Sequence, residues 1–140
     1  MKPQIGDIIK IPLRREDNIT PKHGFQERNK YCVVIGTPDF GYYVAYLIVD
    51  HAINLKFNPS KILIDNFYPL SKKDYPQFIE DRYDPSWLDL TEIREMESSR
   101  IEREGTFYCR LTDRDLQLIL QTLRDSELIT IKQKRRCNLL

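Results

Sequence analysis

Apolar residues near the start of the chain gather into three short runs that polar segments separate. The runs cover residues 5–13, 31–35 and 42–49. They are rich in β-branched and aromatic residues, so each run predicts a β-strand. The connection between the second and third runs is short and contains Pro38, Asp39 and Gly41. Turn-forming residues in so short a connection predict that these two strands form a β-hairpin.

The middle of the chain has a weaker pattern. Residues 62–64 form a brief apolar run that indicates a further strand. Three prolines between positions 69 and 85 argue against a long helix or strand in that segment. Apolar and polar residues then alternate across 87–96, and residues 106–110 form another short apolar run. We predict a strand for each of these two segments.

The clearest helical pattern lies near the end of the chain. Thr112 is a good N-cap, and Asp115 stands where a capping box usually has glutamate. Leu111 and Leu116 occupy the two positions of a hydrophobic staple. One apolar face follows with helical spacing: Leu116, Ile119, Leu120 and Leu123. This pattern predicts a helix over about 112–125.

Many strands followed by one terminal helix are typical of a mostly β domain, here a small barrel closed by a C-terminal helix. The 140 residues fit one domain, which is large enough to bury a core without disulfides or metals. We assign this domain to residues 1–130. The basic segment 131–140 is predicted to be a flexible tail.

Composition narrows the classes of function only slightly. The net charge is +1, so no global field demands a nucleic-acid partner. The three cysteines are far apart, which argues against a disulfide framework or a zinc site, and Cys32 and Cys109 are expected to be buried thiols. The two histidines are isolated, so we expect no metal and no cofactor.

The chain also lacks the pattern of a membrane or secreted protein. No segment approaches the roughly 20 apolar residues that a membrane helix needs. The first residues lack the charged and apolar regions of a signal peptide. We therefore expect a cytoplasmic protein without a membrane partner.

Four motifs, in order, resemble those of the MazF/PemK-like toxin family. The chain opens with Gly-Asp-Ile-Ile at 6–9, and Lys-Tyr-Cys-Val-Val-Ile at 30–35 follows a long polar loop. Residues 87–94, Trp-Leu-Asp-Leu-Thr-Glu-Ile-Arg, are similar to the family's hydrophobic-D-L-S-Q-I-R strand. Residues 110–116, Arg-Leu-Thr-Asp-Arg-Asp-Leu, are similar to its helix entry. Relative to the shortest members, residues 58–85 look like an insertion.

The resemblance implies a fold, an assembly and an activity. The implied fold is a small SH3-like barrel with a C-terminal helix, and the implied assembly is a homodimer. The implied activity is metal-independent cleavage of single-stranded RNA by an endoribonuclease that an antitoxin counters. The alternative is a non-catalytic module on the same barrel that binds nucleic acid or a protein partner.

Metal-independent RNA cleavage needs a base for the 2′-hydroxyl, a cation for the phosphorane and a proton donor for the leaving oxygen. The family's arginine position holds Lys30 here, and Arg28 lies two residues before it. The family's Thr/Ser pair aligns with Val49 and Asp50, and His51 follows. A carboxylate can act as a base, and histidine can shuttle protons near neutral pH. The candidate catalytic residues are therefore Lys30, Arg28, Asp50 and His51.

Residues that contact the substrate are expected in and after the long loop. Lys22 and His23 lie within that polar segment, and Tyr31 follows the family's arginine position. Loops of this length inside a compact domain usually have a function. Tyr75 and Tyr83 stand beside basic residues in the 58–85 segment and are the least core-like aromatics, so they could stack on unpaired bases. The alternative for all these residues is a solvated loop or an ordinary core position.

Overall fold

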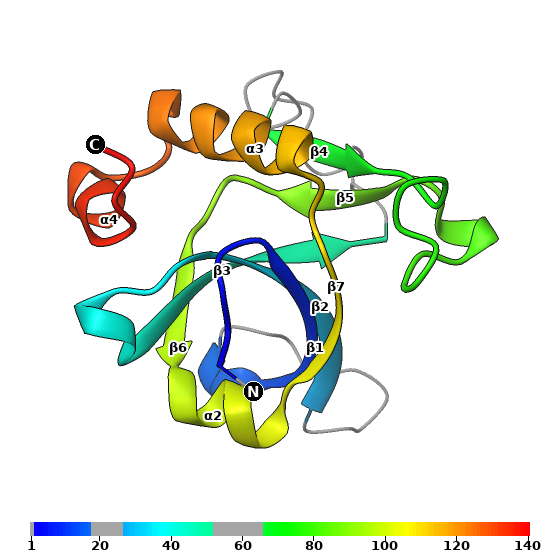
Figure 1. The fold of residues 1–140 in the computed structure, drawn as a ribbon, viewed down its shortest axis with the longest axis horizontal. Helices are drawn as coiled ribbons and strands as arrows, with labels where there is room; N and C mark the ends of the chain where they lie inside the picture. The colour runs from blue at the N-terminus through cyan, green and yellow to red at the C-terminus, as the bar shows by residue number, and fades with distance from the viewer. Residues whose placement is uncertain (1, 18–26, 52–65) are drawn as a thin grey trace.

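A computed structural model of the chain describes residues 2–17, 27–51 and 66–140 (Figure 1). Seven strands form one antiparallel sheet, in the spatial order β4-β5-β3-β2-β1-β7, and β6 also pairs with β3. The strands are β1 (Asp7–Arg14), β2 (Glu27–Gly36), β3 (Tyr43–Asp50), β4 (Phe67–Leu70), β5 (Ser86–Asp89), β6 (Arg94–Glu97) and β7 (Thr106–Arg110). The sheet curls into a half-barrel, which confirms the mostly β prediction.

Within the described ranges, three α-helices and three short 3-10 helices accompany the sheet. The α-helices are α2 (Ser98–Glu104), α3 (Asp113–Asp125) and α4 (Ile131–Arg136). The 3-10 helices are η1 (Arg15–Asp17), η2 (Asp39–Gly41) and η3 (Asp81–Tyr83). In Figure 1, α2 lies near one end of the curled sheet, and α3 and α4 lie near the other. Among the described residues, no helix combines the length and apolar character that crossing a membrane would require.

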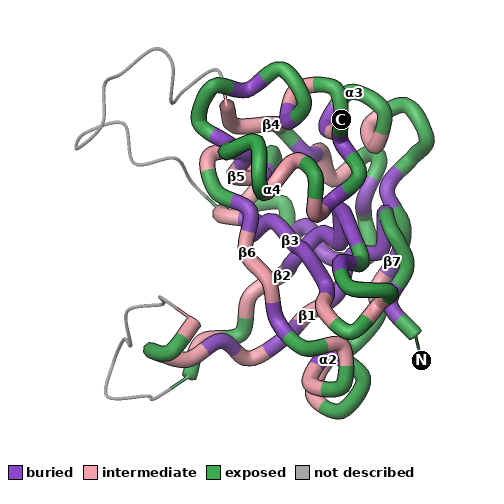
Figure 2. The backbone as a smooth tube through the Cα atoms, turned by 90° about the vertical axis from the view of Figure 1, so that its left-hand side faces the viewer, coloured by how far each residue is buried: buried purple, intermediate pink, exposed green. Residues whose placement is uncertain are grey.

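The predicted hairpin of the second and third strands is confirmed. Tyr31 faces Val49 and Val33 faces Leu47 in the β2–β3 register. A register shift follows near Gly36, where the two strands approach their turn. The central strands β1, β2 and β3 contain much of the buried chain (Figure 2).

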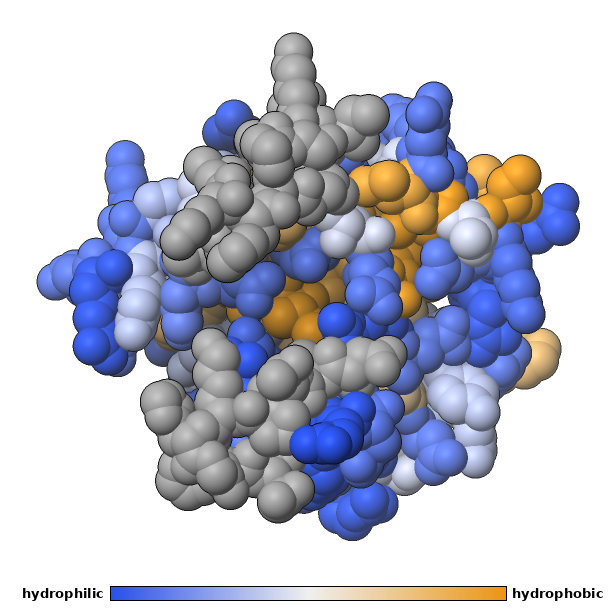
Figure 3. Space-filling model, turned by 180° about the vertical axis from the view of Figure 1, so that it is seen from behind, coloured by the Kyte–Doolittle hydropathy of each residue, from blue (hydrophilic) through white to orange (hydrophobic). Residues whose placement is uncertain are grey.

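Alternation along these strands produces two apolar cores, one on each face of the sheet. The larger core includes Ile8, Val33 and Leu47, together with Ile119 and Leu123 of α3. The smaller core contains the residues that alternate with them: Ile9, Ile11, Leu13, Cys32, Val34, Val44, Tyr46, Ile48, Met96 and Ile101. Strands that bury both faces have continuous apolar runs, which explains the pattern along the first part of the chain. From behind, the surface is mostly hydrophilic, with a few apolar regions between hydrophilic ones (Figure 3).

The predicted C-terminal helix is confirmed, but the hydrogen bonds of the Asp115 side chain in its first turn differ from those of a capping box. The Thr112 side chain accepts a hydrogen bond from the Asp115 backbone N–H. The Asp115 carboxylate does not complete a capping box, because it accepts hydrogen bonds from the hydroxyls of Tyr68 and Tyr75. Tyr75 is 1% exposed, so the expectation that it is among the least core-like aromatics is wrong. Its hydroxyl contacts α3 while its ring belongs to the larger core.

The single strand expected over 87–96 is divided into β5 and β6. Asp89 interrupts it, since its side chain accepts hydrogen bonds from both the backbone N–H and the hydroxyl of Thr91. This local turn competes with strand pairing. Both pieces still pair with the same edge of β3, β5 through Val49 and Asp50 and β6 through residues 43–46.

Part of the basic segment 131–140 forms α4, a helix that the sequence analysis did not predict. Thr130 and Gln133 form a capping box at the start of α4. Cys137 and Leu139 are buried in the larger core. Arg136 pairs with Glu95 of β6 at 2.7 Å. These contacts could not be predicted from the sequence, because a run of basic residues at the C-terminus is typical of a solvent-exposed segment.

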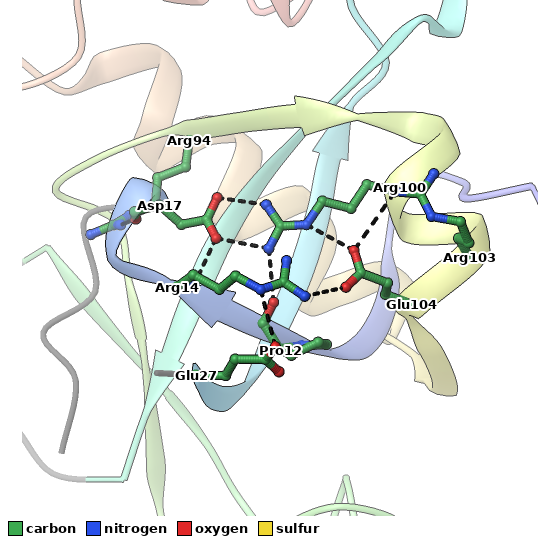
Figure 4. A network of polar contacts seen from close by, with 8 residues as sticks. All are labelled: Pro12, Arg14, Asp17, Glu27, Arg94, Arg100, Arg103 and Glu104. Carbon is green, nitrogen blue, oxygen red and sulfur yellow. Dashed lines mark hydrogen bonds and ion pairs between the residues drawn. The ribbon is translucent and has the colours of Figure 1, made fainter. Parts of the chain in front are cut away.

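An ion network joins η1 to α2 beside the smaller core (Figure 4). Arg100 donates to both carboxylate oxygens of Asp17, at 2.7 and 2.8 Å, and to the Pro12 carbonyl at 2.9 Å. Glu104 accepts from Arg100 at 3.1 Å and from Arg14 at 2.6 Å. Burial raises the pKa of the Asp17 carboxyl, but the hydrogen bonds from Arg100 and from the Arg14 backbone outweigh it and lower that pKa overall. The network therefore holds α2 against the end of β1.

Candidate functional site

The structure divides the candidate catalytic residues between the two faces of the sheet. Side chains alternate along a strand, so Lys30 shares a face with Cys32, and Asp50 shares that face with Ile48. His51 follows Asp50, and it lines a cavity with Tyr31 on the opposite face. Among the described residues, His51 thus lines a cavity that Lys30, Arg28 and Asp50 do not line.

Lys30 and Asp50 form a cross-strand ion pair. The lysine Nζ lies 3.2 Å from the Asp50 Oδ1, and the two side chains are 16% and 33% exposed. Their proximity follows from the β2–β3 register, in which the adjacent residues Tyr31 and Val49 face each other. A lysine whose charge is matched by a neighbouring carboxylate gives little net attraction for a phosphate. Arg28 lies on β2 opposite Leu13 of β1 and is half-buried.

The other face contains a cavity of about 280 Å³, which we call the aromatic pocket. Its lining combines aromatic rings with polar and charged side chains. The lining residues are Lys10, Asn29, Tyr31, His51, Phe78, Glu80, Arg82 and Tyr83. They come from β1, β2, the end of β3 and the segment that leads into η3. The pocket thus joins the sheet to the 58–85 segment.

His51 and Tyr83 form a stacked pair at the pocket. Their ring centroids are 4.0 Å apart, and the rings are inclined by 14°. The His51 side chain is otherwise exposed, and Tyr83 is half-buried. Partial burial lowers the pKa of His51 from its ordinary value of 6.5, and the positive charge of Lys30 lowers it further. The imidazole is therefore neutral near neutral pH and can accept a proton.

Cations lie over the tyrosine rings of the pocket. The Lys10 Nζ is 5.6 Å from the centroid of Tyr31, and the Arg82 guanidinium carbon is 4.6 Å from that of Tyr83. Such cation–π contacts orient a cation without neutralising its charge. Lys10 forms no ion pair with a carboxylate among the residues that the structure describes. Arg82 contacts Glu80 at 2.9 Å, but both side chains are more than 60% exposed, so this ion pair is weak.

Tyr31 supports the floor of the pocket. Its ring lies 4.9 Å from Phe78 and 5.1 Å from Tyr108, in tilted and edge-on arrangements. Burial and a hydrogen bond with Tyr108 raise the pKa of the Tyr31 hydroxyl to about 12. Tyr31 is consequently a neutral ring at physiological pH, suited to contact with a ligand but not to acid–base chemistry.

Several lining residues escaped the sequence analysis. Lys10 faces Tyr31 across the β1–β2 ladder, so its place could have been deduced from strand pairing once the register was known. Asn29 and Glu80 had no local signal that separated them from ordinary loop residues. Tyr83 was singled out as a possible stacking residue, and the structure places it at the pocket.

The remaining expectations concern the long loop, metal ligands and the cysteines. Lys22 and His23 lie outside the described residues. Within the described ranges, no cluster of at least three His, Cys, Asp or Glu side chains is arranged to hold a metal ion. Cys32, Cys109 and Cys137 are all buried and free, as expected for the first two. Burial raises the pKa of the Cys137 thiol to about 11, so it is not a reactive thiolate.

No protein-family model matches the chain, and no curated protein matches its sequence. The geometry of the aromatic pocket therefore carries the functional argument.

Proposed function

We propose that this protein binds single-stranded RNA and that the aromatic pocket receives a base and its neighbouring phosphate. The observation that carries the proposal is the stacked pair of His51 and Tyr83 beside two cations. Aromatic rings next to basic side chains are the common elements of sites for unpaired nucleotides.

Each part of the pocket has a role in this proposal. The exposed His51 ring extends the stack to a base, and Tyr83 holds that ring in place. Lys10 and Arg82 attract the phosphate, and together they outnumber the single carboxylate of Glu80. The choice of RNA over DNA rests on the MazF/PemK resemblance. The SH3-like barrel of that family, a cytoplasmic location, a homodimer and a cognate antitoxin belong to the same proposal.

The binding test uses a fluorescent single-stranded RNA of mixed sequence and measures its anisotropy. We expect Tyr83→Ala to weaken binding by roughly 1–3 kcal/mol, the usual contribution of one stacked base. Arg103→Gln is the matched control for a surface change, because Arg103 lies on α2 outside the pocket and is 68% exposed. Equal affinity of Tyr83→Ala and wild type would overturn the proposal, and a DNA strand of the same sequence tests the preference for RNA.

A second candidate function is metal-independent cleavage of the bound RNA. The specific observation is that His51 is neutral near neutral pH and lies in the same pocket as Lys10. In this reaction His51 accepts the 2′-hydroxyl proton, the 2′-oxygen attacks the adjacent phosphorus, the bond to the 5′-oxygen breaks, and a water molecule supplies the proton that the leaving 5′-oxygen takes up. The products are a 2′,3′-cyclic phosphate and a 5′-hydroxyl, and Lys10 stabilises the charge on the phosphorane.

An RNA-cleavage assay in EDTA tests which face of the sheet carries the catalytic residues. If His51 is the base, His51→Ala abolishes cleavage, whereas Lys30→Ala and Asp50→Ala retain it. The opposite result would place the chemistry at the Lys30–Asp50 pair, as the resemblance implies. No cleavage by folded wild-type protein that still binds RNA would leave the binding function alone.

A further inference from the structure

Tyr46 of β3 places a hydroxyl group in the smaller core. The residue is 2% exposed, and its neighbours in that core are apolar. Among the residues that the structure describes, the Tyr46 hydroxyl has no hydrogen-bond partner. A hydroxyl without a hydrogen bond is unfavourable in a protein interior, and phenylalanine would fill the same space without that cost. Packing of the core therefore does not explain why a tyrosine stands at this position.

The hydroxyl of Tyr46 is reached from a cavity of about 250 Å³, which we call the acidic cleft. The described residues that line this cleft are Glu16, Asp17, Tyr46, Glu92, Ile93, Arg94 and Glu95. In the described part of the chain, every fully buried side-chain nitrogen or oxygen has a hydrogen-bond partner. Because the Tyr46 hydroxyl has none, it is not fully buried, and the space that Tyr46 lines is the acidic cleft.

Strand pairing and one arginine position the walls of the acidic cleft. Tyr46 faces Arg94 in the β3–β6 ladder, and residues that face each other across a ladder point to the same side of the sheet. The Arg94 guanidinium donates to the carbonyl of Asp17, so η1 and β6 lie side by side (Figure 4). Glu16 of η1 and Glu92 before β6 are exposed, whereas Tyr46 is buried. The cleft thus has carboxylates at its mouth and a hydroxyl at its floor.

Two of the four carboxylates in the acidic cleft are free to attract a ligand. Asp17 and Glu95 already pair with arginines that do not line the cleft. Arg94 is the one positive side chain of the described lining, and it contacts Glu92 only at 3.4 Å. Glu16 forms no ion pair among the described residues. The mouth of the cleft therefore retains negative charge and unused acceptor oxygens.

We propose that the acidic cleft binds an organic cation, an ammonium or guanidinium group on an alkyl chain, which donates to the Tyr46 hydroxyl and to the carboxylates of Glu16 and Glu92. These groups carry only hydrogen-bond donors, so they match a set of acceptors. Their alkyl chains let the charged end reach a buried acceptor. Burial raises the pKa of the Tyr46 hydroxyl, so the phenol stays neutral and its oxygen accepts. A free amine and a lysine or arginine side chain of a peptide both present this chemistry.

The test is calorimetric titration with agmatine, which has a guanidinium at one end and an ammonium at the other. Tyr46→Phe removes only the hydroxyl, and we expect agmatine to bind about tenfold more weakly, as for loss of a hydrogen bond to a charged group. The urea midpoint of this variant should equal or exceed that of wild type, because the hydroxyl has no partner to lose. Tyr42→Phe is the matched control, since Tyr42 is 59% exposed and lies outside the described lining.

Glu92→Gln is an independent variant that removes a charge at the mouth of the acidic cleft. We expect weaker agmatine binding, with a smaller difference from wild type at high salt. Glu127→Gln, an exposed change away from the described lining, is its control. A blocked peptide with one arginine among glycines is titrated in parallel, and the tighter of the two probes identifies the source of the cation.

Three results would overturn the proposal. The first is no saturable binding of either probe at low millimolar concentrations, and the second is binding that Tyr46→Phe leaves unchanged. The third is saturable binding of magnesium chloride in place of both probes. The proposal does not rest on RNA binding, because Tyr46 does not belong to the described lining of the aromatic pocket. The anisotropy of the RNA with Tyr46→Phe should therefore match wild type, which keeps the two questions separate.

Discussion

The ion network around Arg100 and the aromatic pocket use basic side chains in opposite ways. In the network, Arg100 binds Asp17 and Glu104, and the carboxylates neutralise its charge (Figure 4). In the pocket, Lys10 lies over the Tyr31 ring with no carboxylate partner among the described residues, and Arg82 lies over the Tyr83 ring with only the exposed Glu80 as its partner. A basic residue therefore indicates a phosphate site only when its neighbours are known. By this criterion the Lys30–Asp50 pair resembles the network more than the pocket.

The largest expected effect is a loss of protein stability when the ion network is broken. Arg100→Gln leaves Asp17, whose side chain is 10% exposed, without its bidentate partner. We expect the free energy of unfolding to fall by about 3 kcal/mol, measured by urea denaturation, because removing one partner of a largely buried pair leaves an uncompensated charge. RNA affinity should remain that of wild type at temperatures where the variant is folded.

Arg103→Gln on the same helix is the control for this change, with an expected effect within about 0.5 kcal/mol for an exposed site. A weaker affinity for RNA in folded Arg100→Gln would contradict the separation of the two regions.

The next largest effect is on RNA affinity, through the positive charge of Lys10 in the aromatic pocket. Lys10→Gln removes a cation that has no carboxylate partner among the described residues. We expect binding of single-stranded RNA to weaken and the slope of log affinity against log salt to fall by about 0.7, the value for one phosphate contact. Lys132→Gln, an exposed change on α4, should leave the slope unchanged. An unchanged slope in Lys10→Gln would assign the phosphate contact to another residue.

The Lys30–Asp50 ion pair should contribute less to the free energy of unfolding than the network around Arg100. A double-mutant cycle with Lys30→Ala and Asp50→Ala should give a coupling free energy of at most about 1 kcal/mol, because both side chains are partly exposed. Unfolding in urea measures this coupling. Loss of RNA binding in either folded single variant would mean that the pair acts directly on the ligand.

The smallest effect is the pH dependence that His51 contributes. Its pKa is lower in the folded protein than its ordinary value of 6.5, mainly because of burial. Below that value the unfolded chain binds more protons than the folded chain, so stability falls as pH decreases until the folded pKa is passed. His51→Gln should reduce this loss. Parallel stability curves for wild type and variant over the same range would contradict the assigned direction.

Local patterns predicted the elements that have strong periodicity. The hairpin of β2 and β3 and the start of α3 followed from apolar runs, turn residues and Thr112. Helix α2 was missed because Ile101 is its only buried residue, so the segment has no repeating apolar face. Gly105 ends that helix, where a Cβ would lie 2.6 Å from the Ile101 carbonyl oxygen.

The sequence predicted contacts of the candidate site only between residues on strands that are adjacent in the chain. Lys30 and Asp50 meet because hairpin partners are set by local sequence. His51 follows the end of β3 and lines the aromatic pocket, whereas Asp50 pairs with Lys30. The approach of Tyr83 to His51 depends on the path of a proline-containing segment across the sheet, which no short pattern encodes. Tyr75 was misassigned for the same reason, because its burial comes from packing against distant elements.

The close approach of Cys137 to Gly36 has a consequence for how the chain folds. A Cβ at Gly36 would lie 3.2 Å from the Cys137 Cα, so β2 and the end of α4 nearly touch. This contact closes a loop of about 100 residues, and the entropy of such closure is lost before the contact gives any stabilisation. We therefore expect the contact between the end of α4 and the β2–β3 hairpin to form after the hairpin itself. An exopeptidase that trims past Leu139 would remove a buried side chain from the larger core.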